Sequence, residues 1–120
     1  MYHQDWLMRQ IEMTAKFIAK FIFGKTSELY IPYYVEDNKE IDVLYTELER
    51  LLNEGHINAA ENLLFEKANP IDIRYLELAV DFYSRLNRLT DEELEAAFFS
   101  REEVEDGLSQ FAQRYNIETF

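Results

Sequence analysis

The sequence predicts an all-α protein, with about six helices in a single domain over residues 1–120. Gly and Pro are rare, with 3 and 2 residues respectively, so few positions interrupt a helix. Apolar residues recur with the period of a helix, and two Ser/Thr-x-x-Glu patterns typical of helix N-termini occur in the last third. We expect a long apolar helix (1–24), an extended connection (25–38) and antiparallel helical hairpins (39–120).

The first helix, expected over about residues 4–23, is apolar on most of its circumference. At about 100° per residue its charges fall on one narrow strip, formed by Asp5, Arg9, Glu12, Lys16 and Lys20. A membrane span would place several of these charges near the bilayer centre, at about 2.5–3.5 kcal/mol for each Arg or Lys. We therefore expect a helix buried by its own domain, with surplus apolar surface that meets a second chain.

Four large apolar residues lie beside the charged strip, where a single domain covers them least: Trp6, Met13, Phe17 and Phe21. We expect them to form a self-association surface, and the protein to be a homodimer. A peripheral membrane protein that uses this helix is an alternative, although a membrane-surface helix usually has a broader and more cationic polar face.

The connection that follows Gly24 contains Pro32 and several tyrosines, which favour an extended segment lying along the helices. We expect aromatic side chains to fix this segment to the core. The alternative is a small ligand-binding bundle or enzyme with a tyrosine-lined pocket. Its candidate lining residues are Tyr30, Tyr33, Tyr45, Tyr75 and Tyr83.

The middle of the chain predicts three helices with short connections. Asp37 and Glu40 have capping-box spacing before a helix over about 39–53. Gly55 ends it, and a helix over about 56–68 follows so closely that the two must be antiparallel. Pro70 is expected at the first position of the next helix, with Ile71 opening its apolar stripe.

The last third carries two capping boxes, Thr90 with Glu93 and Ser100 with Glu103. They predict helices over about 91–98 and 101–115. Gly107 falls inside the second helix, where glycine costs about 1 kcal/mol relative to alanine. This glycine indicates either a close approach of another group to the backbone or a weak point in the helix.

Charge and composition exclude several functions. The formal net charge is −12, which disfavours phosphate and therefore nucleic acid. The absence of cysteine fits a reducing, cytoplasmic setting. Neither His3 nor His56 has a partner at the spacing of a metal site, and no serine lies in a nucleophile motif. We therefore expect no cofactor, no metal and no catalytic residue.

Two stretches carry resemblances. "LLNEGHINAAENLLFEKANP" (51–70) resembles a tetratricopeptide-type hairpin, with Gly55, Ala60 and Pro70 near the small residues and closing proline of that motif. "QDWLMRQIEMTAKFIAKFIFGK" resembles the start of small uncharacterised proteins, mostly from Gram-positive bacteria, in a family of unknown function with a tetratricopeptide-like remainder. The resemblance implies a fold and no activity. The function is therefore unknown, and a non-enzymatic protein–protein interaction module or adaptor is the leading expectation.

Overall fold

The computed structural model describes residues 2–118. Over this range the chain is all-α, as predicted, and no strand occurs. Six α-helices and one short 3₁₀ helix follow in the order α1 (Tyr2–Phe23), η1 (Glu36–Asn38), α2 (Lys39–Asn53), α3 (Ile57–Lys67), α4 (Arg74–Asn87), α5 (Asp91–Ala96) and α6 (Arg101–Gln113).

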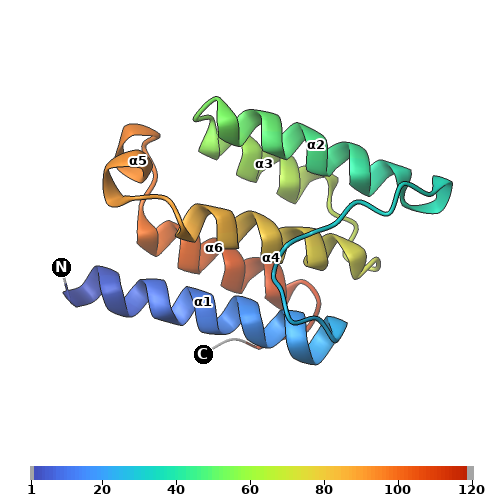
Figure 1. The fold of residues 1–120 in the computed structure, drawn as a ribbon, viewed down its shortest axis with the longest axis horizontal. Coiled ribbons are helices and arrows are strands. Elements are labelled where there is room, and N and C mark those ends of the chain that lie inside the picture. Colours follow the sequence, from blue (N-terminus) through green and yellow to red (C-terminus); the bar gives the residue numbers. More distant parts are fainter. Residues whose placement is uncertain (1, 119–120) are drawn as a thin grey trace.

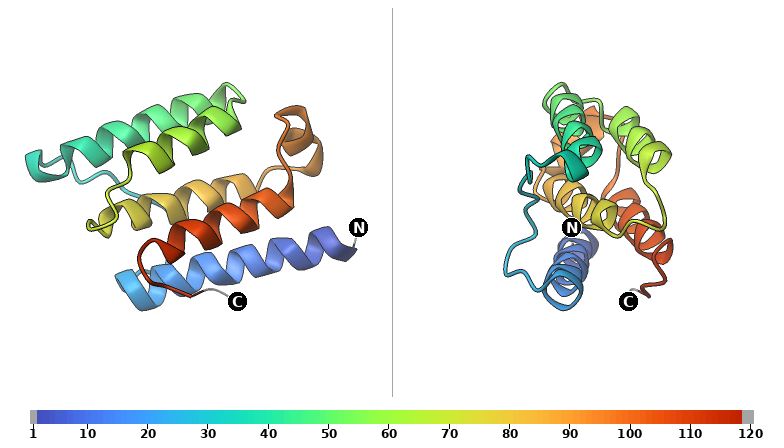
Figure 2. Two further views of the ribbon diagram at one scale, coloured as in Figure 1. Left: turned by 180° about the vertical axis from the view of Figure 1, so that it is seen from behind. Right: turned by 90° about the vertical axis from the view of Figure 1, so that its right-hand side faces the viewer.

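The helices form three layers around α4 (Figure 1). The α2–α3 hairpin lies on one side of α4 and α6, and α1 lies along their other side (Figures 1 and 2). The short α5 connects α4 to α6 at one end. The expectation that the first helix is packed by its own chain is thus confirmed, because α1 contacts both α4 and α6.

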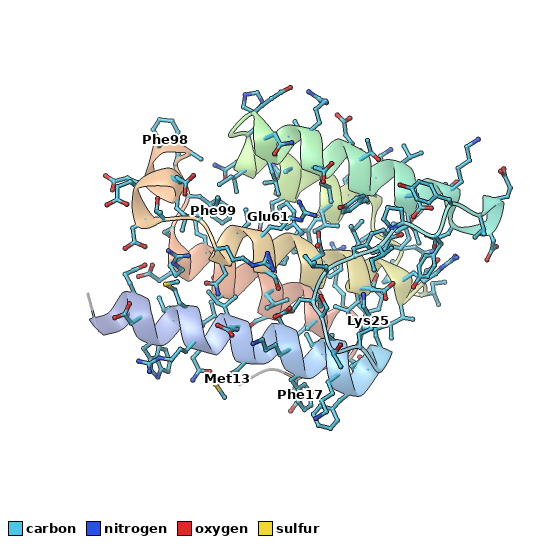
Figure 3. The ribbon with its side chains drawn as sticks, viewed as in Figure 1. Met13, Phe17, Lys25, Glu61, Phe98 and Phe99 are labelled. Atoms are coloured by element: carbon cyan, nitrogen blue, oxygen red, sulfur yellow. The ribbon has the colours of Figure 1, made fainter. Side chains whose placement is uncertain are left out.

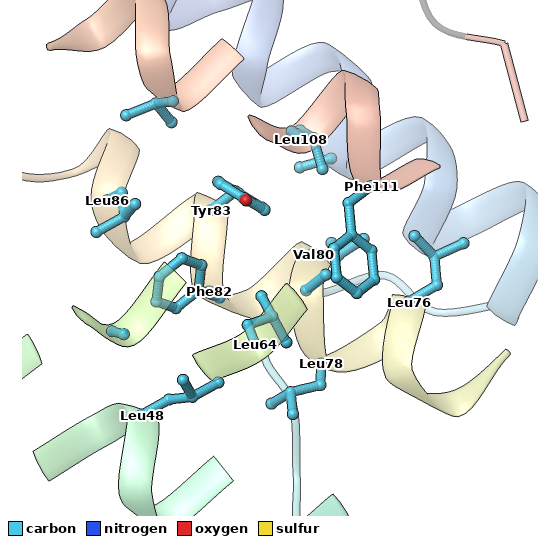
Figure 4. Packing of buried hydrophobic residues seen from close by; sticks show 14 of the residues in the cluster. Leu48, Leu64, Leu76, Leu78, Val80, Phe82, Tyr83, Leu86, Leu108 and Phe111 are labelled. Carbon is cyan, nitrogen blue, oxygen red and sulfur yellow. The ribbon is translucent and has the colours of Figure 1, made fainter. Parts of the chain in front are cut away.

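The core runs along α4, which is buried on almost every side. All residues from Tyr75 to Ser84 are buried, because α4 is covered by α1, α6 and α2. The largest fully buried side chains come from four helices: Tyr83, Phe82, Phe111, Ile11, Ile18, Leu64 and Leu76. Figure 4 shows five of them around α4: Tyr83, Phe82, Phe111, Leu64 and Leu76. Four polar side chains of α4 are buried with the apolar ones: Glu77, Asp81, Ser84 and Asn87.

The two predicted caps in the last third are present. Thr90 accepts a hydrogen bond from the N–H of Glu93, and the Glu93 carboxylate accepts one from the N–H of Thr90. Ser100 likewise accepts from the N–H of Glu103 at 3.2 Å. Here the Glu103 carboxylate accepts from the Ser100 hydroxyl, at 3.1 Å, instead of from the backbone.

The predicted capping box of Asp37 with Glu40 is wrong. A turn of 3₁₀ helix precedes α2, so that Asn38 occupies the N-cap position, and its side chain makes no capping hydrogen bond. The Asp37 carboxylate instead lies 3.3 Å from the Arg74 guanidinium. An ion pair with a residue distant in sequence has thus replaced a local cap.

The predicted start of the fourth helix at Pro70 is also wrong, because α4 begins at Arg74. Asn69 Oδ1 accepts the N–H of Ile71 at 3.0 Å, and Asp72 Oδ1 accepts the N–H of Arg74 at 3.0 Å. Short Asn and Asp side chains that bind nearby backbone N–H groups favour turns over helix. Ile71 consequently lies outside the stripe and is 91% exposed.

Gly107 marks a close approach of α6 to α3 and α4. A Cβ atom at this position would lie 2.6 Å from both Cε1 and Oη of Tyr83, and would also meet Oε2 of Glu61. The Tyr83 hydroxyl donates a hydrogen bond of 2.7 Å to that same Glu61 oxygen. Of the two sequence interpretations, the close approach is therefore the one that the structure confirms.

Candidate functional site

The candidate surface lies on α1, whose circumference has a buried face, a charged face and an exposed apolar face between them. One face is buried against the core and carries Leu7, Ile11, Ala15 and Ile18. The strip of five charged residues is exposed to solvent throughout. The four predicted interface residues lie between these two faces, because their spacing of seven, four and four residues keeps them on one side of the helix. We call this set, Trp6, Met13, Phe17 and Phe21, the apolar row.

All four side chains of the apolar row are exposed, with exposed fractions of 52%, 57%, 39% and 66% in sequence order. The rings of Phe17 and Phe21 lie with their centroids 4.9 Å apart. Met13 and Phe17 project from the side of α1 that faces away from α4 (Figure 3). The structure therefore exposes the four predicted residues on one side of α1, where Gln10 lies between Trp6 and Met13.

The charges beside the apolar row are ordered along the helix. Asp5 lies near its N-terminal end, whereas Lys16 and Lys20 lie toward its C-terminal end. Glu12 accepts a hydrogen bond from Lys16 at 2.7 Å, and this bond raises the pKa of Lys16. The Lys20 ammonium lies 5.6 Å from the centre of the Phe21 ring. Arg9 lies between Asp5 and Glu12, so the charges alternate over the first half of the strip and are basic from Lys16 onward.

Three of the five candidate pocket tyrosines gather around the connection. Tyr30 is buried, and its ring centroid lies 6.1 Å from that of Tyr33 and 5.1 Å from that of Tyr45. Its hydroxyl donates to Asp42 at 2.7 Å and accepts from Asn38 at 2.7 Å. Burial and the bond to Asp42 raise the pKa of Tyr30 far above its ordinary value. Tyr30 therefore fixes the connection to the core, as the first interpretation predicts.

The five tyrosines do not line one shared cavity. Tyr45 borders a space of only about 10 Å³, and Tyr75 borders a separate groove of about 480 Å³ between α2 and α3. Tyr83 is fully buried beside α6, and burial raises its pKa strongly. Among these tyrosines, four place the hydroxyl within hydrogen-bond distance of a carboxylate: Tyr30, Tyr33, Tyr45 and Tyr83.

Sequence reasoning missed three buried carboxylates that hold the connection. Asp42 accepts the N–H groups of Tyr33 and Tyr34, at 3.2 and 2.8 Å, and Asp81 accepts the N–H of Tyr30 at 3.1 Å. Glu77 accepts the Tyr33 hydroxyl at 2.9 Å and lies 3.2 Å from the Lys25 ammonium. These acids lie off the apolar stripes of their helices, and so resemble ordinary solvent-facing residues in the sequence.

The pKa values of these acids reflect their different partners. Burial acts to raise the pKa of Asp42, but hydrogen bonds from Tyr30, the backbone of 33–34 and Asn38 outweigh it and lower the pKa. Burial dominates at Asp81 and raises its pKa, although the bond from the Tyr30 N–H and the charge of Arg85 oppose the change. Asp42 is thus held as a carboxylate that serves as an acceptor for backbone N–H groups.

Residues 2–118 contain neither a cluster of metal-ligand side chains nor a membrane-spanning helix. Within this range no group of three or more His, Asp and Glu side chains could hold a metal ion. None of the helices in the same range combines the length and the apolar character needed to cross a membrane. His56 is exposed beside Glu54, with 3.5 Å between Nδ1 and the carboxylate, and the side chain of His3 lies outside the described part.

Comparison with known proteins identifies a family without assigning an activity. No curated protein matches the chain, and no solved structure matches it. A family model described as a family of unknown function, DUF6483, matches residues 1–116. Since this match covers nearly the whole sequence, the chain belongs to the DUF6483 family.

Proposed function

We propose that this protein is a non-enzymatic protein–protein interaction module that forms a homodimer through α1. The observation that carries the proposal is the apolar row, whose four large side chains are all exposed on one helix face. Single exposed apolar residues are normal on soluble proteins, whereas several large ones gathered on one face and rimmed by charges are typical of an interaction site. The second copy of the chain is the partner that fits this strip best.

Charge complementarity favours an antiparallel pair of α1 helices. In that arrangement Lys16 and Lys20 of one copy lie beside the half of the other copy's strip that carries Asp5, Arg9 and Glu12, whose net charge is −1. A parallel arrangement would place like charges together, which is destabilising. An antiparallel pair also obeys two-fold symmetry, in which the same patch is used by both copies.

The exposed area is sufficient for the centre of a dimer interface. An aromatic side chain buries about 150–250 Å², and the members of the apolar row expose roughly half of their surface, so the row offers about 400 Å² in each copy. A standard interface buries about 800 Å² in each partner. The charged strip lies alongside and supplies a polar rim of the usual kind.

We further propose that the α2–α3 hairpin, as a tetratricopeptide-like unit, serves as the surface for another protein. The groove of about 480 Å³ between these helices has apolar walls from Val43, Leu63 and Tyr75. Lys39 and Lys67 also line it. A groove with apolar walls and charged margins suits an extended or helical peptide segment, so a dimer would present two such grooves.

The dimer is tested by light scattering after size exclusion, at about 100 μM protein. The wild type is expected at twice the chain mass of 14.4 kDa. Phe17→Asp places a charge in the middle of the apolar row and should give a folded monomer, with its helical circular dichroism retained. Ile71→Asp is the matched control, because Ile71 is 91% exposed and lies far from α1 in the sequence, and it should remain a dimer.

Two outcomes would refute a dimer that forms through the apolar row of α1. One is a wild type that is monomeric at this concentration, and the other is a Phe17→Asp variant that still dimerises. Flotation of both proteins with anionic vesicles distinguishes the membrane alternative. A monomeric wild type that floats with vesicles, together with a Phe17→Asp variant that does not, would show that the apolar row contacts lipid and not a second copy.

A further inference from the structure

Phe98 is exposed at a strained position in the turn between α5 and α6. Its ring projects into solvent (Figure 3), with 88% of the residue exposed. Its φ is +57°, in the left-handed region that is unfavourable for a residue with a Cβ and that glycine usually occupies at the end of a helix. The next ring, Phe99, is buried in the core, and its N–H donates to the carbonyl oxygen of Leu94 at 2.9 Å. Phe98 thus strains the fold and gains almost no burial in return, which indicates that its ring serves binding and not stability.

The Phe98 ring borders a hollow of about 530 Å³ between α5 and the turn that joins α2 to α3. Small apolar walls come from Ala59, Ala96 and Ala97. Asn58 holds the two sides together, because its amide donates to the carbonyl oxygens of Ala97 and Phe98 at 3.4 and 3.3 Å. The hollow shares no lining residue with the groove of about 480 Å³ between α2 and α3. It is therefore a separate apolar surface with an aromatic ring at its margin.

Negative charge surrounds this hollow. Glu54 and Glu93 line it, and among the described residues that line it none is a lysine or an arginine. The chain on either side of Phe98, residues 91–103, carries six carboxylates and a single cation, Arg101. Arg101 is 2% exposed and lies 2.7 Å from Asp91, so it balances only that carboxylate. The segment keeps a net charge of −5.

Two positive features near the hollow do not cancel this charge. Arg50 pairs with both Glu47 and Glu54, and one cation between two carboxylates leaves the group with a net charge of −1. The N-terminus of α3 carries roughly half an elementary charge. The surface around Phe98 is therefore complementary to a cationic partner.

We propose that Phe98 and the hollow beside it bind a basic segment of another protein, in which lysine or arginine side chains alternate with apolar ones. An apolar side chain of this segment fills the hollow against Ala59 and Ala97. A neighbouring cation stacks on the Phe98 ring, whose electron-rich face attracts positive charge, and further cations pair with Glu93 and the other carboxylates of α5. An exposed aromatic ring of this kind is a typical anchor of a protein interface.

This surface is separate from the proposed dimer interface. In Figure 3, Phe98 projects from the opposite side of the molecule to Met13 and Phe17 of the apolar row. A dimer that forms through α1 would leave Phe98 accessible in both copies. Failure of one proposal therefore leaves the other unaffected, since a monomeric chain would retain Phe98 and its hollow.

The probe is a short labelled peptide in which arginine and leucine alternate, measured by fluorescence anisotropy at about 150 mM salt. Two comparison peptides replace every arginine by glutamine or by glutamate. The wild type should bind the arginine peptide with a Kd of about 10 μM or tighter, and about tenfold or more tightly than either comparison peptide.

Phe98→Gly should weaken binding of the arginine peptide by about tenfold or more. Glycine suits a positive φ and should stabilise the fold, so this loss cannot come from unfolding. Tyr34→Gly is the matched control, because Tyr34 is also an aromatic residue at a positive φ, +54°, and is 85% exposed. Tyr34 lies on the connection, away from the hollow, and this variant should bind like the wild type.

Three results would overturn the proposal. The first is an arginine peptide that binds no more tightly than the glutamine peptide, since the surface would then not recognise positive charge. The second is equal binding of the arginine peptide by Phe98→Gly and Tyr34→Gly. The third is a Phe98→Gly variant with a smaller mass than the wild type in light scattering, because the ring would then contact a second copy of this chain and not another protein.

Discussion

Replacing Gly107 by alanine should destabilise the protein, although the same change stabilises most helices. The added Cβ would lie 2.6 Å from both Cε1 and Oη of Tyr83, well inside van der Waals contact, and would also meet Oε2 of Glu61. The Glu61 side chain can swing toward solvent. The Tyr83 ring cannot, because it is fully buried between α4 and α6. Either α6 must move away or the ring must leave its rotamer.

The size of the effect follows from three opposing contributions. Alanine in place of glycine gains about 1 kcal/mol in a helix interior. Overpacking a rigid core costs about 1–3 kcal/mol. Displacing Glu61 also breaks the 2.7 Å bond from Tyr83, and a hydrogen bond to a charged group contributes about 1.5–3 kcal/mol. The net loss is about 3 kcal/mol, or a fall in Tm of about 12 °C for a chain of 120 residues.

Urea unfolding followed by circular dichroism, together with calorimetric Tm, measures this loss. Gln110→Ala is the matched control, because Gln110 is an exposed residue of the same helix and should change stability by less than about 0.5 kcal/mol. A double variant with Tyr83→Leu, which removes the obstructing ring, should be more stable than the two single losses predict, by about 1 kcal/mol or more. A Gly107→Ala variant as stable as the wild type would refute the close approach.

Four further substitutions test other features of the structure. Burial raises the pKa of Glu61, so the folded state binds its proton more tightly than the unfolded state. The folded state therefore loses stability as pH rises above the ordinary pKa of 4.5. In urea unfolding at about pH 8, Glu61→Gln should be more stable than the wild type, and a difference that does not shrink toward about pH 5 contradicts this reasoning. Phe98 is 88% exposed at a φ of +57°, so Phe98→Gly should add about 1 kcal/mol to the unfolding free energy. Asn116→Gly, at a φ of +61°, should add less because asparagine tolerates this conformation; equal gains would argue against strain at Phe98. Thr90→Ala removes the N-cap of α5 and should cost about 1 kcal/mol in the same assay, whereas an unchanged midpoint would mean that the capping box is not stabilising.

Helix positions could be predicted wherever the signal is local. The caps at Thr90 and Ser100 depend on residues three positions apart, and both are present in the structure. At Pro70 two local signals conflict, because Asn69 and Asp72 bind nearby backbone N–H groups and favour a turn over the helix start. At Asp37 the error has a distant cause. Arg74 draws Asp37 away from the start of α2, and no periodic pattern can reveal a contact between residues so far apart in the sequence.

The same distinction between local and distant contacts decides which parts of the candidate site could be predicted from the sequence. The apolar row could be predicted because one helix alone sets which of its residues share a face. The three carboxylates that hold the connection, Asp42, Glu77 and Asp81, could not, because their roles depend on where the connection crosses α2 and α4. Gly107 is intermediate, because its presence inside a helix indicated a close contact without indicating that Tyr83 makes it.

The packing of α1 against α4 and α6 has a consequence for the newly synthesised chain. The first helix leaves the ribosome while its covering helices, residues 74–113, are still untranslated. At roughly 5–20 residues per second, this interval lasts several seconds or longer. Throughout it, Ile11 and Ile18 are as accessible as Phe17 and Phe21. The face of α1 that carries Ile11 and Ile18 therefore stays uncovered until α4 and α6 have been synthesised.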